Sequence, residues 1–295
     1  MITINKDQIH FSFDPAEKPC AYASSGSVVR FCCQDCYCGQ MQVDHGDYLQ
    51  MDNRRNPATG PLSIHNAEPG DVLRVEILAI DLASEGTMCA RPGAGIYNIQ
   101  GYHCRRFKLE NGQILFDQGI RLPVSPMVGV IGTAPKTAPL STKHPGEHGG
   151  NLDIRDLGVG ALLYLPVNVP GALLSMGDVH AVQGDGETVT CAMEMSAEVT
   201  VKVDLLKNRS DIPTPFLLAG NFYLTTAADP SLDVCSLAAA RKMQAFLQQH
   251  SGLTDVQSAM LLSLAGNLRI SQVVNPAKGC LMQFPVGLAR EQFER

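Results

Sequence analysis

The chain has 295 residues, enough for one large domain or two. Its 45% hydrophobic and 18% charged residues exclude a disordered chain, and a net charge of −6 with scattered Lys and Arg argues against a nucleic-acid partner. The N-terminus, Met1 to Asp7, has no basic and apolar signal sequence and no long apolar run occurs elsewhere, so we expect a cytoplasmic protein with no membrane partner.

Four cysteines lie close together near the N-terminus, at Cys32, Cys33, Cys36 and Cys38. A strand predicted over the start of this segment points successive side chains to opposite faces, so the four thiols cannot easily converge on zinc. We expect the cysteines of an intracellular chain to be reduced thiols rather than a disulfide framework. Cys36 is an alternative nucleophile, although the neighbouring Asp35 would raise its pKa.

Strand signals dominate residues 1–225, which we predict to be a mainly β region that carries the site loops. The run beginning at Val72 alternates, with Leu73, Val75 and Ile77 apolar, and this pattern is typical of a half-buried strand in a sandwich. The β-compatible runs are Val28 to Cys33, Val72 to Ile80, Ile114 to Phe116, Met127 to Ile131, Leu162 to Val169, Val189 to Met195 and Ala197 to Leu205.

Two polar, glycine-rich segments flank the apolar run from Leu162 to Leu174. Residues 144–156 and residues 177–187 both place His, Asp and Glu beside small residues. Glycine lets the backbone approach a ligand closely, while the acids and histidines supply metal ligands or proton-transfer groups. We therefore expect two polar loops that converge on one pocket, although turn chemistry alone also favours Gly and Asp.

The pattern changes to helix in residues 226–295, for which we predict a helical hairpin followed by two strands. Asp229 or Ser231 caps a first helix that runs to about His250, and Thr254 opens a second that ends at Gly266. The first helix is expected to bury Val234, Leu237, Ala238, Met243, Phe246 and Leu247. The two strands are expected from Leu268 to Val274 and from Cys280 to Val286.

Several motifs together resemble the acetamidase/formamidase family over most of the chain. They are His148-Gly149-Gly150-Asn151-Leu152-Asp153, Tyr164-Leu165-Pro166-Val167, Pro170-Gly171-Ala172-Leu173 and Gly177-Asp178-Val179-His180-Ala181-Val182-Gln183-Gly184-Asp185-Gly186-Glu187. The resemblance implies hydrolysis of a small aliphatic amide, such as formamide or acetamide, to a carboxylate and ammonia. It also implies a mainly β fold: a β-sandwich with a smaller barrel-like part and α/β elements at the C-terminus. A lactamase-like activity on cyclic amides stays open.

An amide is a poor electrophile, so its hydrolysis needs activated water, a stabilised oxyanion and a proton for the departing ammonia. We predict catalytic roles for His180, Glu187, Asp153 and Asp35. Asn151 and Gln183 are expected to bind the substrate, or else to cross-link the loops. A divalent metal, zinc or calcium, is a possible cofactor with ligands among His180, Asp35, Asp153 and His148; alternatively, Glu187 acts as the base without metal.

Two other classes of function fit the same loops. The chain is alternatively a non-catalytic β-sandwich module that binds a metal or small ligand, or a subunit whose polar loops form an interface. Turnover separates these classes, because a binding module would saturate without releasing ammonia. We expect a homodimer, the commonest state of soluble oligomers.

Overall fold

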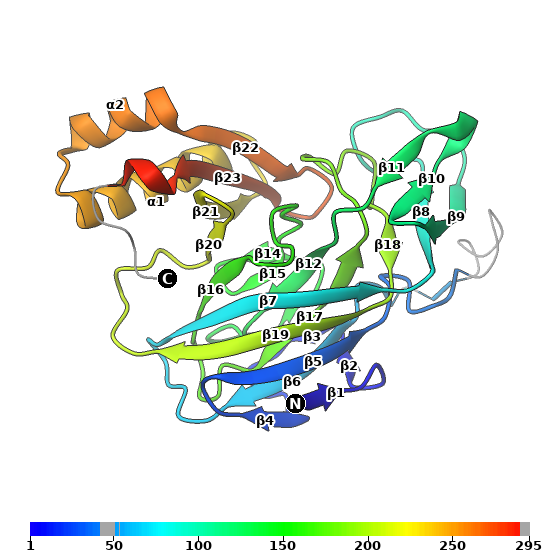
Figure 1. Ribbon diagram of the computed structural model, residues 1–295, viewed down its shortest axis with the longest axis horizontal. Helices are drawn as coiled ribbons and strands as arrows, with labels where there is room; N and C mark the ends of the chain where they lie inside the picture. The colour runs from blue at the N-terminus through cyan, green and yellow to red at the C-terminus, as the bar shows by residue number, and fades with distance from the viewer. Residues whose placement is uncertain (42–50, 53, 290–295) are drawn as a thin grey trace.

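The computed structural model describes residues 1–41, 51–52 and 54–289, and its main feature is a pair of large β-sheets that pack face to face (Figure 1). One sheet has nine strands. Their order across the sheet is β1 (Ile2–Ile4), β5 (Ser27–Cys33), β19 (Ala197–Leu206), β7 (Val72–Leu82), β16 (Leu162–Pro166), β20 (Phe216–Ala219), β21 (Phe222–Asp229), β23 (Lys278–Pro285) and β22 (Asn267–Gln272).

The other sheet has twelve strands and carries β17 (Leu174–His180) near its middle. Its main path is β11 (Arg121–Pro123), β10 (Gln113–Leu115), β9 (His103–Glu110), β8 (Glu85–Ala90), β18 (Glu194–Met195), β17, β12 (Met127–Gly132), β15 (Gly149–Asn151) and β14 (Pro145–Gly146). The side branch β6 (Ala58–Ile64) pairs with β17 and with β2 (Ile9–His10) and β4 (Ala21–Ala23). The short strands β3 (Ser12–Phe13) and β13 (Leu140–Ser141) form a separate pair.

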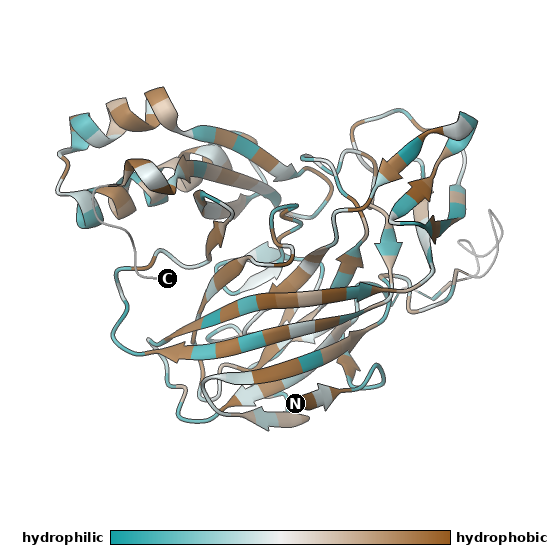
Figure 2. Cartoon of the chain, in the orientation of Figure 1, coloured by the Kyte–Doolittle hydropathy of each residue, from teal (hydrophilic) through white to brown (hydrophobic). Residues whose placement is uncertain are grey.

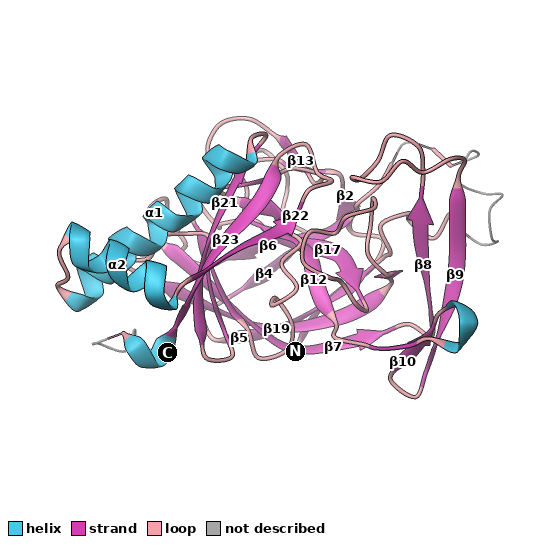
Figure 3. Cartoon of the chain, turned by 90° about the horizontal axis from the view of Figure 1, so that it is seen from above, coloured by secondary structure: helices cyan, strands magenta, loops and turns pink. Residues whose placement is uncertain are grey.

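The core lies between the two sheets and explains the alternating sequence pattern. Leu73, Val75 and Ile77 of β7 are fully buried, and Figure 2 shows the same alternation of apolar and polar residues along β5, β7 and β19. The expected mainly β fold with helices near the C-terminus is therefore confirmed. Within the described residues neither large sheet closes into a barrel, and β8 to β11 form an open antiparallel extension at one end (Figure 3).

Two helices, α1 (Leu232–Ser251) and α2 (Asp255–Ala265), cover the C-terminal part of the nine-stranded sheet. Ser231 caps α1, Gly252 ends it with a left-handed backbone, and Thr254 forms a capping box at α2, as expected. The predicted boundary between residues 225 and 226 falls inside β21. Neither described helix is both long and apolar enough to cross a membrane.

The buried face of α1 agrees only in part with the expected one, since Met243, Phe246 and Leu247 are buried as predicted. Cys235, Ala239 and Met243 lie buried against the sheet, whereas Val234 and Leu237 are about half exposed, at 51% and 50%. The small Ala239 lets the helix approach so closely that its carbonyl accepts a hydrogen bond from Thr225 Oγ1 of β21 at 2.7 Å. The contact explains why a small residue, Ala239, lies at the centre of the buried face.

The cysteines behave differently from one another. Cys89 and Cys104 lie opposite each other on β8 and β9 and form a disulfide, so the expectation that the cysteines are reduced is wrong for this pair. Cys33 is buried while its neighbour Cys32 is partly exposed, as the alternation of a strand requires. Among the described residues, Cys36 is the one member of the N-terminal group that joins a possible set of metal ligands.

Candidate active site

The site is built around β17, where Asp178 and His180 lie on a fully buried strand. The prediction that residues 177–187 form a polar loop is therefore wrong for Gly177 to His180. The buried strand accommodates the imidazole and carboxylate because they pair with each other and with Glu194 of the adjacent β18: His180 Nε2 lies 3.1 Å from Glu194 Oε1 and 3.6 Å from Asp178 Oδ1.

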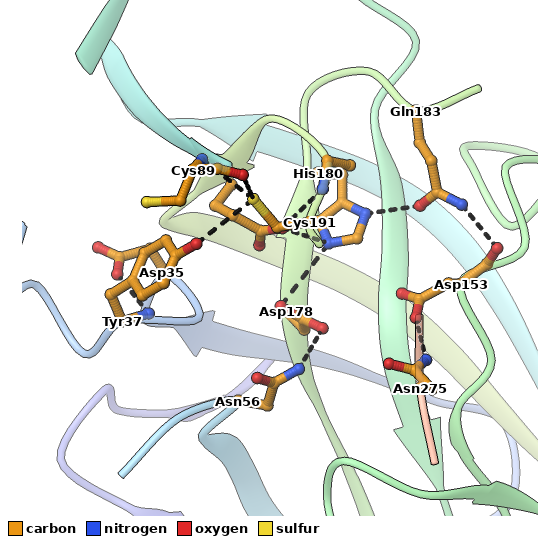
Figure 4. Close-up of polar contacts among 12 residues, drawn as sticks. Asp35, Tyr37, Asn56, Cys89, Asp153, Asp178, His180, Gln183, Cys191 and Asn275 are labelled. Carbon is orange, nitrogen blue, oxygen red and sulfur yellow. Dashed lines mark hydrogen bonds and ion pairs between the residues drawn. The ribbon is translucent and has the colours of Figure 1, made fainter. Parts of the chain in front are cut away.

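Gln183 fixes the orientation of His180 (Figure 4). Its Oε1 lies 2.8 Å from His180 Nδ1, while its Nε2 donates to the carbonyl oxygen of Asp153 at 2.8 Å. Because Oε1 can only accept, Nδ1 carries a proton and Nε2 faces the carboxylates. Gln183 therefore links the two polar segments through its own side chain.

Three asparagines hold the carboxylates from the other side. Asn56 donates to Asp178 Oδ2 at 2.7 Å, and Asn275 donates to Asp153 Oδ2 at 2.6 Å (Figure 4). With its amide nitrogen facing the acids, Asn151 donates to Asp153 Oδ2 at 3.2 Å and to Asp178 Oδ2 at 3.1 Å. The structure thus gives Asn151 the cross-linking contacts that were the alternative to substrate binding.

Three of the acids sit on strained backbone. Asp153, Asp178 and Glu187 have φ angles of 47°, 54° and 41°, in the left-handed region that residues with side chains rarely adopt. Gly129 of β12 packs against the same place: a Cβ there would lie 2.7 Å from Asp153 Oδ1 and 2.7 Å from the carbonyl oxygen of Asp178. Strain concentrated on neighbouring polar residues is typical of functional sites.

Burial and mutual repulsion shift the pKa values of these groups. Burial raises the pKa of Glu187 well above its ordinary value, and the negative charge of Asp153 raises it further. Burial also raises the pKa values of Asp153 and Glu194. Burial alone lowers the pKa of His180, but the carboxylates of Glu194 and Asp178 outweigh it and raise that pKa well above the ordinary value. The cluster therefore retains protons that exposed carboxyl groups would lose.

A cavity of about 430 Å³ opens directly onto this cluster. Asp178, Glu187 and Glu194 line it, while His180 and Asp153 lie immediately behind them. The loop between β22 and β23 closes one side with Val274, Asn275 and Pro276, and it is attached to the Glu187 loop by a hydrogen bond from Gly186 N to Ser271 O at 2.9 Å. The remaining walls are Cys36, Tyr37, Arg55, Asn56, Arg91, Lys143, Asn151, Thr190 and Cys191.

Two predicted residues lie apart from the cluster. The Asp35 carboxylate accepts from the backbone N–H groups of Tyr37 and Gly39, at 2.9 and 3.1 Å, and so organises its own turn. His148 is buried edge-on against Phe13, with ring centroids 5.0 Å apart, and neither ring nitrogen has a hydrogen-bond partner. Neither residue joins a possible set of metal ligands among the described residues.

Sequence reasoning missed Asp178, Glu194, Asn56 and Asn275. Asp178 lies inside the glycine-rich motif, and Glu194 is an acid between two buried methionines, which is a usable signal because unpaired acids are rarely buried. Asn56 and Asn275 come from segments far away in the chain. Their neighbouring residues give no indication that they meet the cluster.

The donor set fits a divalent cation. Glu187 Oε2 and Glu194 Oε2 are buried without a hydrogen-bond partner, whereas the buried atoms Asp178 Oδ1 and His180 Nε2 have only the charge contacts given above. Two groups have their ligand atoms within 4.8 Å of one another: Cys36 with Asp178 and Glu194, and Asp153 with His180 and Glu187. The sulfur and imidazole nitrogen suit zinc, whereas the many carboxylate oxygens suit calcium.

Known proteins share this fold and these segments. The sequence profile described as the Acetamidase/Formamidase family matches residues 137–288, which include Asn151, Asp153, the β17 motif and Glu194. The chain belongs to the acetamidase/formamidase family. Family members of known structure include an acetamidase from Bacillus halodurans, which is 39% identical, covers 97% of this chain and 98% of its own, and has a TM-score of 0.95.

Two further relatives bear on the assignment. A protein from Thermoanaerobacter tengcongensis, described as a predicted acetamidase/formamidase, is 35% identical with a TM-score of 0.93 and covers 96% of this chain and 95% of its own. A formamidase from Methylophilus methylotrophus is 27% identical over 263 residues, which are 68% of this chain and 65% of that protein. The chain covers between 60% and 66% of the length of the curated relatives that it matches.

Proposed function

We propose that this protein hydrolyses a small aliphatic amide to a carboxylate and ammonia. The observation that carries the proposal is the buried group of Asp153, Asp178, Glu187, Glu194 and His180 beside a cavity, in a member of this family. Burying so many ionisable groups costs folding free energy, and such clusters with shifted pKa values are typical of functional sites. The names of the relatives, an acetamidase and a formamidase, support the same substrate class.

Glu187 is the proposed proton carrier. It lines the cavity, its Oε2 has no hydrogen-bond partner, and its raised pKa lets it hold a proton near neutral pH. In the reaction, Glu187 takes a proton from the attacking water and gives it to the amide nitrogen as the C–N bond breaks. The products are the carboxylate and ammonia.

Asp178 and Glu194 are proposed to position the substrate, because both line the cavity and each has a carboxylate oxygen with no hydrogen-bond partner. These oxygens accept hydrogen bonds from the amide NH2 group of the substrate. His180 lies behind them and keeps both acids in place through its Nε2, while Gln183 keeps its ring oriented.

A divalent ion, zinc or calcium, is part of the proposal. Cys36, Asp178 and Glu194, or Asp153, His180 and Glu187, would hold it. When bound, such an ion would lower the pKa of a water molecule and stabilise negative charge on the amide oxygen. Chelation should then lower both activity and thermal stability, since an ion that binds only the folded chain stabilises it.

Ammonia release tests the proposal. Purified protein is given formamide, acetamide and a small lactam, with and without prior chelation, beside E187Q and H180A. We expect release from a linear amide that falls at least a hundredfold in E187Q. The control is H65A, which removes an exposed histidine stacked on Tyr22, away from the cavity. Saturable binding without any ammonia would favour the binding-module alternative instead.

The homodimer and the cytoplasmic location expected from the sequence remain predictions. Sedimentation of the purified chain tests the first, and fractionation of the source cells tests the second.

A further inference from the structure

The cavity beside the acids also carries basic side chains. Arg55, Arg91 and Lys143 line the same space as Asp178, Glu187 and Glu194. They come from three separate segments: the approach to β6, the loop after β8 and the turn after β13. A neutral amide of three or four heavy atoms carries no charge of its own for three separate cations to bind.

Among the described residues, Arg91 has no anionic partner. It is half buried, and its Nε–H group is inaccessible to solvent and donates to no described residue. Its loop is held against the Glu187 loop, because Ile96 N donates to Thr188 O at 3.0 Å. The guanidinium is thus fixed near the acids but is not neutralised by them.

Lys143 shows the same absence of a counter-charge. Burial lowers its pKa and the positive charge of Arg55 lowers it further; the Cys36 thiol opposes this shift, and no described carboxylate is among the groups that act on it. Two half-buried cations that lack carboxylate partners form a site for an anion supplied from outside.

The size of the cavity agrees with a longer ligand. Its volume of about 430 Å³ is in the range of pockets that enclose molecules much larger than acetamide. Both acids and cations line this cavity, so a ligand that satisfies both has an uncharged amide for the acids and an anion for the cations.

We propose that the preferred substrates are monoamides of short dicarboxylic acids, with the carboxylate bound by Arg91 and Lys143 and the amide placed at Asp178, Glu187 and Glu194. This inference rests on the proposed amide hydrolysis. Water adds to the amide carbon, the C–N bond breaks, and the nitrogen leaves as ammonia, so the products are a dicarboxylate and ammonia. Without these cations, the acidic cluster would repel such a substrate.

The test compares each monoamide with its neutral diamide of the same shape: malonamate with malonamide, and succinamate with succinamide. In the wild type, kcat/KM for at least one monoamide should exceed that of its diamide by tenfold or more. R91M and K143M should each reduce this ratio ten- to a hundredfold, mainly through KM, and R91K should restore part of it. Added salt should also reduce the ratio.

The matched control is K136M, which removes the charge of an exposed lysine outside the cavity lining and should keep the wild-type ratio. Thermal melts establish that each variant is folded. Equal kcat/KM for monoamides and diamides, or a ratio unchanged in both R91M and K143M, would overturn this inference while leaving amide hydrolysis intact.

A different set of results would contradict the proposed amide hydrolysis itself. If no amide releases ammonia, calorimetric titration with succinamate and succinamide still reports the binding preference. Tighter binding of succinamate that is lost in R91M would support the anion site and overturn hydrolysis. Equal binding of both ligands, together with no turnover, would overturn the two proposals together.

Discussion

Gln183 illustrates how the sequence can point to a side chain while its role stays open between substrate binding and cross-linking of the loops. The structure gives it cross-linking contacts: its amide oxygen faces His180 Nδ1 and its amide nitrogen donates to the Asp153 carbonyl oxygen. Residues that orient a functional histidine usually affect activity strongly although they never touch the substrate.

We therefore predict that Q183L lowers kcat ten- to a hundredfold, because His180 loses the acceptor that fixes its ring. Q183E retains an acceptor and should lose less. The comparison is made from steady-state rates with acetamide, and the melting temperature of each variant shows whether the loss follows from unfolding. Equal activities of Q183L and the wild type would remove Gln183 from the site.

His148 gives a pH prediction at the same scale. Burial lowers its pKa from 6.5 to about 4, so the unfolded chain takes up a proton there that the folded chain refuses. The contribution of His148 to the free energy of unfolding is therefore fully present above pH 6.5 and is lost as the pH falls towards 4. This single group accounts for about 3 kcal/mol over that interval.

The variant H148L should therefore show a flatter decrease in the free energy of unfolding between pH 6.5 and 4. Urea titrations at several pH values measure it, with H65L as the control because His65 is exposed. If His148 were instead a metal ligand, as the sequence suggested, H148L would lose bound metal at neutral pH, and metal analysis of the same samples would detect this.

At the scale of elements, the site depends on how closely β12 approaches β17. Gly129 has no space for a Cβ between Asp153 and Asp178. We predict that G129A displaces these groups, lowers activity at least tenfold and destabilises the fold by about 1–3 kcal/mol. G184A is the matched control, since a Cβ at Gly184 meets nothing within 4 Å. Comparable activity of G129A and G184A would contradict this arrangement.

Substitutions in helix α1 test which of its faces is buried. Met243 is fully buried and Leu237 is 50% exposed, although the sequence pattern places both in the core. We predict that M243A costs about 2–4 kcal/mol of unfolding free energy and L237A less than about 1 kcal/mol. Urea unfolding followed by circular dichroism measures both, and similar losses would favour the sequence-based face.

These cases show what local sequence determines. The caps of α1 and α2 depend on a few neighbouring residues, so Ser231, Gly252 and Thr254 could be assigned from sequence. The orientation of α1 depends on the sheet beneath Ala239, which no local pattern reports. Likewise, the predicted strand from Val189 to Met195 shortens to Glu194–Met195, and two of the preceding residues, Thr190 and Cys191, line the cavity.

For the whole molecule too, local sequence determines some features of the site and the complete fold determines the others. The two polar segments do meet, as the sequence predicts, because their strands β15 and β17 lie on either side of β12 in one sheet. Asn56 and Asn275 reach the acids from residues far before and far after them in the chain, through the packing of β6 and the β22–β23 loop. Long-range contacts of this kind depend on the complete fold.

The position of β17 also determines how the residues of the site can unfold. It has β12 along one edge and β6 with β18 along the other, so neither edge is open to solvent. Fraying and loop opening, which release amide protons elsewhere at low free-energy cost, cannot expose Asp178 or His180. Exchange of their backbone amides requires cooperative opening of the twelve-stranded sheet, so the functional cluster persists until the global transition.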